Sequence, residues 1–177
     1  MAKKVIKVKL TPDSIQNAID EIEKFKQWIL DKTTELLKEL AEHGVQVAKI
    51  NFSPENAMYD GMNDVKVEFE MRGDKKVAVV ATGQAVLFIE FGTGILWADT
   101  HPENRFSRGE YGYGLGKMAG GWRYKGDPGT NGEVITDGKH AGEVHTYGNP
   151  ANASLYLAVR DVEREFTEIA RRVFGSG

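Results

Sequence analysis

One apolar periodicity dominates the first third of this 177-residue chain. Large apolar side chains recur at spacings of three, four and seven residues: Ile15, Ile19, Ile22, Phe25, Ile29, Leu36 and Leu40. Because this spacing places side chains on one face of an α-helix, it predicts a long amphipathic helix. The residues before it form a typical helix start, with Thr11 as N-cap, Pro12 in the first turn and Asp13 as an early carboxylate.

The length of this helical pattern raises the question of what covers its apolar face. The pattern continues past Gly44 to Val47 and Ile50, which exceeds the usual length of a helix in a globular domain. The core of the chain itself is one possible cover, and a neighbouring subunit is a second. Length and composition favour the chain's own core.

Three other segments show the period of two that is typical of β-strands. Residues 3–10 place Ile6, Val8 and Leu10 on one side and Lys7 and Lys9 on the other, which predicts a short strand suited to a sheet edge. Residues 65–71 and 77–81 flank a turn that contains glycine and predict a β-hairpin. Residues 51–64 between the helix and the hairpin carry turn signals and predict a loop.

A second helix is predicted at the end of the chain. Its apolar positions follow the helical spacing and end near Phe174: Leu155, Ala158, Val159, Val162, Phe166, Ile169, Ala170 and Val173. We therefore predict a single α+β domain over residues 1–177. In this fold the long N-terminal helix and the C-terminal helix pack on an antiparallel β-sheet.

The apolar run at residues 84–95 contains a single carboxylate, Glu90. An ionised group in a buried run needs hydrogen-bond partners, and we expect Glu90 to accept from backbone N–H groups of the tight turn at Gly92-Thr93-Gly94. No second carboxylate or histidine lies nearby in the sequence, which disfavours a catalytic role. The run is too short for its period to distinguish helix from strand, although the spacing of Phe88 and Phe91 favours a helix.

Residues 97–147 are rich in glycine and aromatic residues and show little periodicity. A structureless loop of this length is uncommon, so we expect an insertion that is partly ordered, functional, or ordered on assembly. Residues 105–125 carry five basic side chains and one acidic one, a local charge of 5 − 1 = +4 in a chain of net charge −3. The candidate partner contacts are Arg105, Arg108, Tyr111, Tyr113, Lys117, Trp122, Arg123 and Tyr124. The overall acidic charge favours a protein partner over DNA, although basic residues among aromatic ones also suit a single strand.

No catalytic set, metal site or cofactor site is predicted, and we expect the protein not to be an enzyme. His101, His140 and His145, with Asp99 and Asp137, lack a recognised ligand spacing, so a histidine-dependent metal hydrolase is only the alternative function. The glycines of residues 112–116 lack the context of a phosphate-binding loop, and neither Ser107 nor Ser154 lies in a nucleophile motif.

The chain has no cysteine, which suits a reducing compartment. Its first residues lack the apolar core of a signal peptide, and no apolar run approaches the roughly 18 residues of a membrane span. We therefore expect a soluble protein made in the cytoplasm.

Two short motifs resemble a known family signature. Ile89-Glu90-Phe91-Gly92-Thr93-Gly94 and Gly148-Asn149-Pro150-Ala151, the latter just before the final helix, are similar to the signature of a family of tailed-bacteriophage neck and tail components. These are the gene-product-ten-like proteins of lambdoid siphoviruses, also described as tail-completion or minor structural proteins. The resemblance follows most of the chain in order, from the first helix through the hairpin to the closing helix.

The resemblance implies a structural virion protein that acts in tail completion or head–tail joining. It implies a ring of identical subunits, with a hexamer favoured, that contacts connector or head-closure proteins and tail-tube proteins. The location would be the neck or tail of the virion, after assembly in the host cytoplasm. Glu90 to Gly94 would fix the central turn, and Pro150 and Ala151 would set the start of the last helix. The chain departs from the family at residues 154–156, where members carry a second proline and an aromatic residue, and in the length of the insertion after residue 96.

Overall fold

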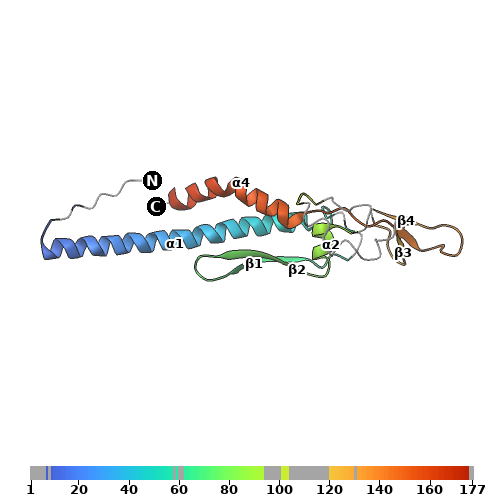
Figure 1. Cartoon of the computed structure of the whole chain (residues 1–177), viewed down its shortest axis with the longest axis horizontal. Helices are drawn as coiled ribbons and strands as arrows, with labels where there is room; N and C mark the ends of the chain where they lie inside the picture. The colour runs from blue at the N-terminus through green and yellow to red at the C-terminus, as the bar shows by residue number, and fades with distance from the viewer. Residues whose placement is uncertain are drawn as a thin grey trace.

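The computed structural model describes residues 7, 9–57, 59, 62–93, 101–103, 120–129 and 131–175. The elements in chain order are α1 (Pro12–Asn51), β1 (Lys66–Met71), β2 (Val77–Thr82), α2 (Val86–Phe91), β3 (Trp122–Tyr124), β4 (Gly132–Val134), β5 (Val144–Thr146) and α4 (Ser154–Gly175). They form an elongated molecule in which α1, α4 and the β1–β2 hairpin run side by side and the small β3–β5–β4 sheet lies at one end (Figure 1). The predicted α+β class, with a long N-terminal helix, a C-terminal helix and antiparallel strands, is confirmed.

Helix α1 spans 40 residues and begins where the sequence predicts. Thr11 occupies the N-cap position with an extended backbone, but its hydroxyl makes no capping hydrogen bond. The side chain of Ser14 instead accepts a hydrogen bond from the backbone N–H of Lys9 at 2.8 Å. Lys7, Lys9 and Leu10 lie outside any strand, and the rest of the predicted strand at residues 3–10 lies outside the described residues.

The C-terminal half of α1 forms the centre of the core. Ala41, Gly44, Val45 and Ala48 are buried and share one helical face. Gly44 marks the closest approach, because a Cβ atom there would lie 3.2 Å from methyl carbons of both Val79 on β2 and Val162 on α4. The small side chains on this face therefore let the hairpin and α4 approach α1 together.

The β1–β2 hairpin has one apolar and one charged face. Its antiparallel register pairs Phe69 with Val79 and Val67 with Ala81, and these side chains pack against the core cluster. On the opposite face, Glu68 pairs with Val80. The two β-rich runs predict this hairpin correctly; β1 alternates between exposed residues and the core-facing Val67 and Phe69, whereas β2 is half-buried along most of its length.

Helix α2 follows the hairpin directly, as the spacing of its aromatic residues predicts. Asp64 holds the start of this segment, since its carboxylate accepts from the backbone N–H of Gln84 at 2.8 Å and of Ala85 at 2.9 Å. These two hydrogen bonds, first that of Gln84 and then that of Ala85, lower the pKa of the Asp64 carboxyl from its ordinary value. The loop predicted before the hairpin thus ends at Asp64, which is hydrogen-bonded to the two residues just before α2.

Part of the insertion at residues 97–147 is ordered as a three-stranded antiparallel sheet, in the order β3–β5–β4. Strand β5 lies in the centre, so that His145 pairs with Arg123 on one side and with Glu133 on the other. Each strand has three residues, which is too short for an alternating pattern to be visible in the sequence.

Replacing Asp64 with alanine is expected to lower the melting temperature at neutral pH, because the N–H groups of Gln84 and Ala85 lose their acceptor. The folded-state pKa of Asp64 lies below its ordinary value, so its contribution to stability is complete above the unfolded-chain pKa of about 3.9. That contribution is lost as the pH falls through the folded-state pKa. The difference in melting temperature between wild type and Asp64→Ala should therefore shrink below about pH 4. A difference that stays constant into strong acid would contradict this role.

Candidate assembly surfaces

The two sequence motifs, which are more than 50 residues apart in the chain by their numbering, form one packed junction. The backbone N–H of Thr93 donates to the carbonyl of Asn149 at 2.8 Å, and the Thr93 hydroxyl accepts from the backbone N–H of Asn149 at 3.0 Å. Gly94 lies outside the described residues. The segment after α2 therefore pairs with the segment that leads into α4.

Glycine is required at this junction because the two backbones nearly touch. Gly92 has a φ of +73°, and a Cβ atom there would lie 2.6 Å from the backbone nitrogen of Ala151. The approach at Gly148 is closer still, because an added Cβ atom there would lie 2.2 Å from the carbonyl oxygen of Thr93. The residues after Pro150 and Ala151 are then held by α2, with Asn152 N–H donating to the carbonyl of Ile89 at 2.8 Å. The two motifs act as one structural unit.

Glu90 has a different partner from the one that the sequence predicts. Its carboxylate accepts from the backbone N–H of Leu155 at 2.7 Å and of Tyr156 at 3.0 Å, in the first turn of α4. The N–H of Thr93, within the turn that was the predicted partner, donates to Asn149 instead. The prediction that backbone N–H groups satisfy Glu90 is confirmed, but the prediction that the Gly92–Gly94 turn supplies them is wrong.

The start of α4 explains why this carboxylate is buried. Ala153, the residue before α4, has a φ of +50° and carries no side-chain acceptor. The first-turn N–H groups of a helix need acceptors, and a negative charge at this end also interacts favourably with the helix dipole. Glu90 of α2 therefore caps α4 from a distant position in the sequence.

His101 packs against this cap. Its Nε2 lies 3.4 Å from Glu90 Oε1, while its Nδ1 accepts from the backbone N–H of Glu103 at 3.0 Å. Because Nδ1 accepts, the neutral ring carries its proton on Nε2 and directs it toward the carboxylate. The ring is buried between Phe91 and Tyr156, with centroid distances of 5.1 and 5.6 Å. His101 is therefore a buried side chain that packs inside the fold beside the cap.

The other two candidate metal-binding histidines lie in separate surroundings. His140 Nδ1 is 2.9 Å from Glu143, and His145 Nε2 is 2.6 Å from the carbonyl oxygen of Gly120. Across the described residues, no group of three or more potential ligand side chains is arranged to hold a metal ion. Asp99, Ser107 and residues 112–116 fall outside those residues, whereas Ser154 is fully buried at the start of α4, where its hydroxyl accepts from Asn152 at 2.8 Å.

Three of the predicted partner contacts are described, and all belong to β3. Trp122 and Tyr124 line a pocket of about 260 Å³ together with Tyr59 and Phe88, whose rings stack at 6.4 Å. Arg123, between them on β3, is exposed and does not line this pocket. The remaining candidates, Arg105, Arg108, Tyr111, Tyr113 and Lys117, lie outside the described residues. The two aromatic side chains thus take part in the junction between the small sheet and α2.

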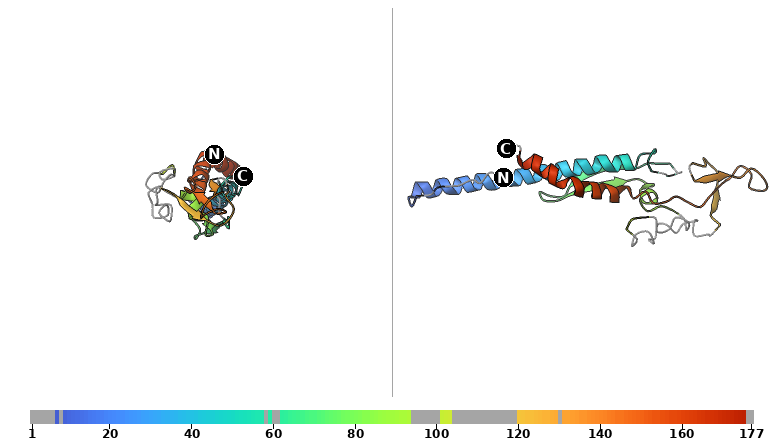
Figure 2. Two further views of the ribbon diagram at one scale, coloured as in Figure 1. Left: turned by 90° about the vertical axis from the view of Figure 1, so that its right-hand side faces the viewer. Right: turned by 90° about the horizontal axis from the view of Figure 1, so that it is seen from above.

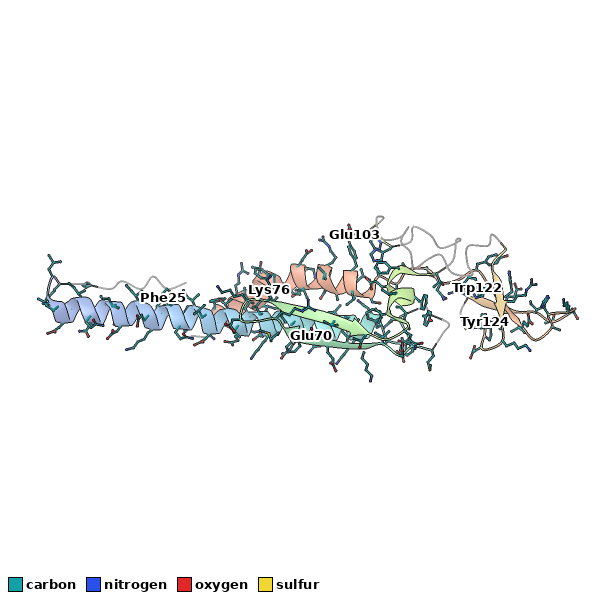
Figure 3. The ribbon with its side chains drawn as sticks, turned by 60° about the horizontal axis from the view of Figure 1, so that its bottom comes forward. Phe25, Glu70, Lys76, Glu103, Trp122 and Tyr124 are labelled. Atoms are coloured by element: carbon teal, nitrogen blue, oxygen red, sulfur yellow. The ribbon has the colours of Figure 1, made fainter. Side chains whose placement is uncertain are left out.

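A row of exposed apolar side chains lies at the other end of the molecule. Residues 12–27 of α1, the projecting segment, extend beyond the hairpin and the end of α4 (Figures 1 and 2). On this half of α1, five large side chains form what we call the exposed stripe, each between 39% and 57% exposed: Ile15, Ile19, Ile22, Phe25 and Ile29. Phe25 stands on this segment, far from Trp122 and Tyr124 (Figure 3).

The C-terminal end of the exposed stripe lies beside the end of α4. Trp28 stacks on Phe25 at 5.7 Å and meets the ring of Phe174 edge-on at 6.0 Å. All residues from 21 to 30 are nevertheless exposed. The sequence pattern predicts the apolar face correctly, but the core cluster covers only the C-terminal half of α1; in the N-terminal half Ala18, between Ile15 and Ile22, is buried while the larger side chains beside it are exposed. Contiguous apolar patches of this kind mark interaction surfaces.

Comparisons with protein-family models, with curated proteins and with solved structures find no match to this chain. Within the described ranges, no helix combines the length and the apolar composition needed to cross a lipid bilayer.

Replacing Glu90 with alanine should lower the free energy of unfolding by about 1–3 kcal/mol, because two buried N–H groups lose a charged acceptor. Urea unfolding measures this change. Glu23→Ala on the exposed surface of α1 is the matched control and should change stability by less than about 0.5 kcal/mol. Equal effects of the two substitutions would contradict the capping role.

Gly92→Ala should destabilise the protein by about 2–4 kcal/mol, because the added methyl group meets the backbone of Ala151 and the backbone conformation disfavours alanine. Gly73→Ala is a sharp control, since Gly73 has a similar φ of +76° but no atom within 4 Å of an added Cβ. Its loss should be about 1 kcal/mol, measured by the same urea titration. If both variants lose the same amount, the close approach at the motif junction is not important.

Proposed function

We propose that this protein is a structural subunit that assembles with copies of itself into a ring. We further propose that the ring belongs to the neck or tail of a tailed bacteriophage, where it acts in tail completion or head–tail joining. The observation that carries the self-assembly is the exposed stripe on α1. Its five side chains have the size and spacing of a helix–helix interface but no cover among the described residues.

The energetics favour a partner for the stripe but require a second contact. Burying the exposed part of each of these side chains contributes about 1 kcal/mol, or about 5 kcal/mol for all five. Association costs an estimated 4–15 kcal/mol in lost translational and rotational freedom. The stripe alone therefore gives at best weak association, and a stable ring needs a further surface on the neighbouring copy.

The geometry suits a head-to-tail arrangement. The stripe lies at one end of an elongated molecule, and the packed body lies beside the other half of the same helix (Figure 1). When one end of a subunit contacts a different surface of the next, the contact repeats and closes into a ring if the rotation allows it. A stripe that contacts the body of the next copy meets this condition.

The assignment to a phage neck or tail rests on the two motifs that resemble the signature of that family. In this structure Gly92 and Thr93 pack directly on Asn149 and Ala151. Two short stretches that form one packed unit are a stronger basis for the resemblance than two unconnected matches. The buried cap formed by Glu90 gives a structural reason for the acidic residue in the first motif.

The self-assembly is tested by light scattering of the purified protein over a concentration series. Wild type should form a discrete multimer, and Ile22→Asp should shift it toward the monomer, because a carboxylate would face the apolar interface. The melting temperature of the Ile22→Asp monomer should change little, since Ile22 is 57% exposed and contributes little to the core.

Asn17→Asp is the matched control, because it places the same residue on the exposed helix at a position outside the stripe. It should leave the multimer intact. A wild-type protein that remains a monomer at every concentration would contradict the proposed ring.

A further inference from the structure

An apolar groove runs along the body of the molecule between α1, α4 and the outer edge of β2. Its volume is about 480 Å³. It is lined by residues of three elements: Leu40, Ala41 and Gly44 of α1, Val77 and Val79 of β2, and Leu155, Ala158, Val159, Val162 and Glu163 of α4. The groove is open along its length and is a second apolar surface besides the exposed stripe.

The strand that lines the groove, β2, has one edge with which no described strand pairs. In the described part of the chain, β2 pairs only with β1, and the groove is lined by β2 and not by β1. A two-stranded sheet is marginally stable, and an extended segment that adds to its edge gains main-chain hydrogen bonds. A third strand beside β2 would place alternate side chains into the groove. The shape therefore favours an extended segment over a helix.

A segment with the required pattern lies before α1. Residues 3–10 alternate apolar and basic side chains, with Ile6, Val8 and Leu10 on one side. Leu10 is 97% exposed, so its side chain is available for a contact that the single chain does not make. Three apolar side chains at every second position match a groove beside a strand.

The segment cannot reach the groove of its own chain. Leu40, at the near end of the groove, lies 28 residues beyond Pro12, which is about 42 Å along α1. Residues 6–10 span only about 17 Å when fully extended. The groove that receives this segment must therefore belong to another copy.

We propose that residues 3–10 of one copy add to the edge of β2 in the next copy, as a third strand that fills the groove with Ile6, Val8 and Leu10. This inference rests on the proposed self-assembly. The added strand would be the further contact that a stable ring needs besides the exposed stripe. It also places the projecting segment of α1 beside the body of the neighbouring copy, so the exposed stripe and the added strand belong to one interface.

Charge supports this occupant. With the apolar side chains in the groove, Lys7 and Lys9 lie on the outer face of the enlarged sheet. The outer face of the hairpin carries Lys66, Glu68 and Glu70 on β1, and Arg72 pairs with Glu70 at 3.4 Å (Figure 3 labels Glu70). The reverse orientation would bury Lys7 and Lys9 in an apolar groove, so the charged side chains favour the outward orientation.

Cross-linking between two different variants tests the contact, and the absence of native cysteine makes the experiment specific. Lys7→Cys and Val80→Cys place thiols on the outer face of the proposed sheet, one in each copy. The two full-length variants, one carrying an affinity tag, are mixed and treated with a short bis-maleimide. A covalent dimer containing one chain of each variant is expected. Asp127→Cys in place of Val80→Cys is the control, because Asp127 lies beyond β3 at the other end of the molecule, and it should give no such dimer.

A second substitution makes the result specific for the groove. Val8→Asp in the Lys7→Cys chain should reduce the yield of the mixed dimer roughly tenfold, because a carboxylate is excluded from an apolar groove. Light scattering of the same samples separates the two proposals. A multimer that gives no mixed dimer would overturn the strand contact and leave the ring in place, whereas a strict monomer would overturn both.

Discussion

The contact between Glu90 and the first turn of α4 holds together the parts of the structure that the chain order keeps apart. Helix α4 begins after Ala153, which offers no side-chain cap, so its first N–H groups depend on a carboxylate from α2. The same contact fixes the segment that carries Asn149 to Ala151 against Gly92 and Thr93. Together with the close packing of Val162 on Gly44, this buried acceptor fixes the position of α4 on α1, and these two helices line the apolar groove.

The apolar face of α1 is buried in one half of the helix and exposed in the other. In its C-terminal half the apolar face meets the hairpin and α4, and Gly44 allows both to approach closely. In its N-terminal half the same periodicity continues where no other element of the described structure follows, and the exposed stripe results. A helix of about 60 Å extends at its N-terminal end beyond the hairpin and the end of α4, so that part of its apolar face remains exposed.

The sequence predicts the elements better than their partners. Both long helices and the hairpin follow from periodicity, because each has an apolar face of the right spacing, whereas the run at α2 is too short for its period to decide and only the spacing of Phe88 and Phe91 favours a helix. The partner of Glu90 lies 65 residues away, and local turn chemistry pointed instead to the neighbouring glycines. The strands at Trp122 and Val144 are too short to show a pattern. Periodicity likewise reveals the apolar face of α1 but not what covers each half, which depends on where α4 ends.

Three features of the single chain leave apolar surface or backbone hydrogen-bonding groups uncovered. The exposed stripe, the groove beside β2 and the unpaired edge of that strand are surfaces that no other described part of the chain covers, and the proposed assembly would cover all three with another copy. A stripe of about 5 kcal/mol cannot by itself offset the cost of association, whereas a stripe together with a strand that gains backbone hydrogen bonds can. The stability of the assembly would then depend on both contacts at once, so the loss of either would release the subunit while leaving its fold intact.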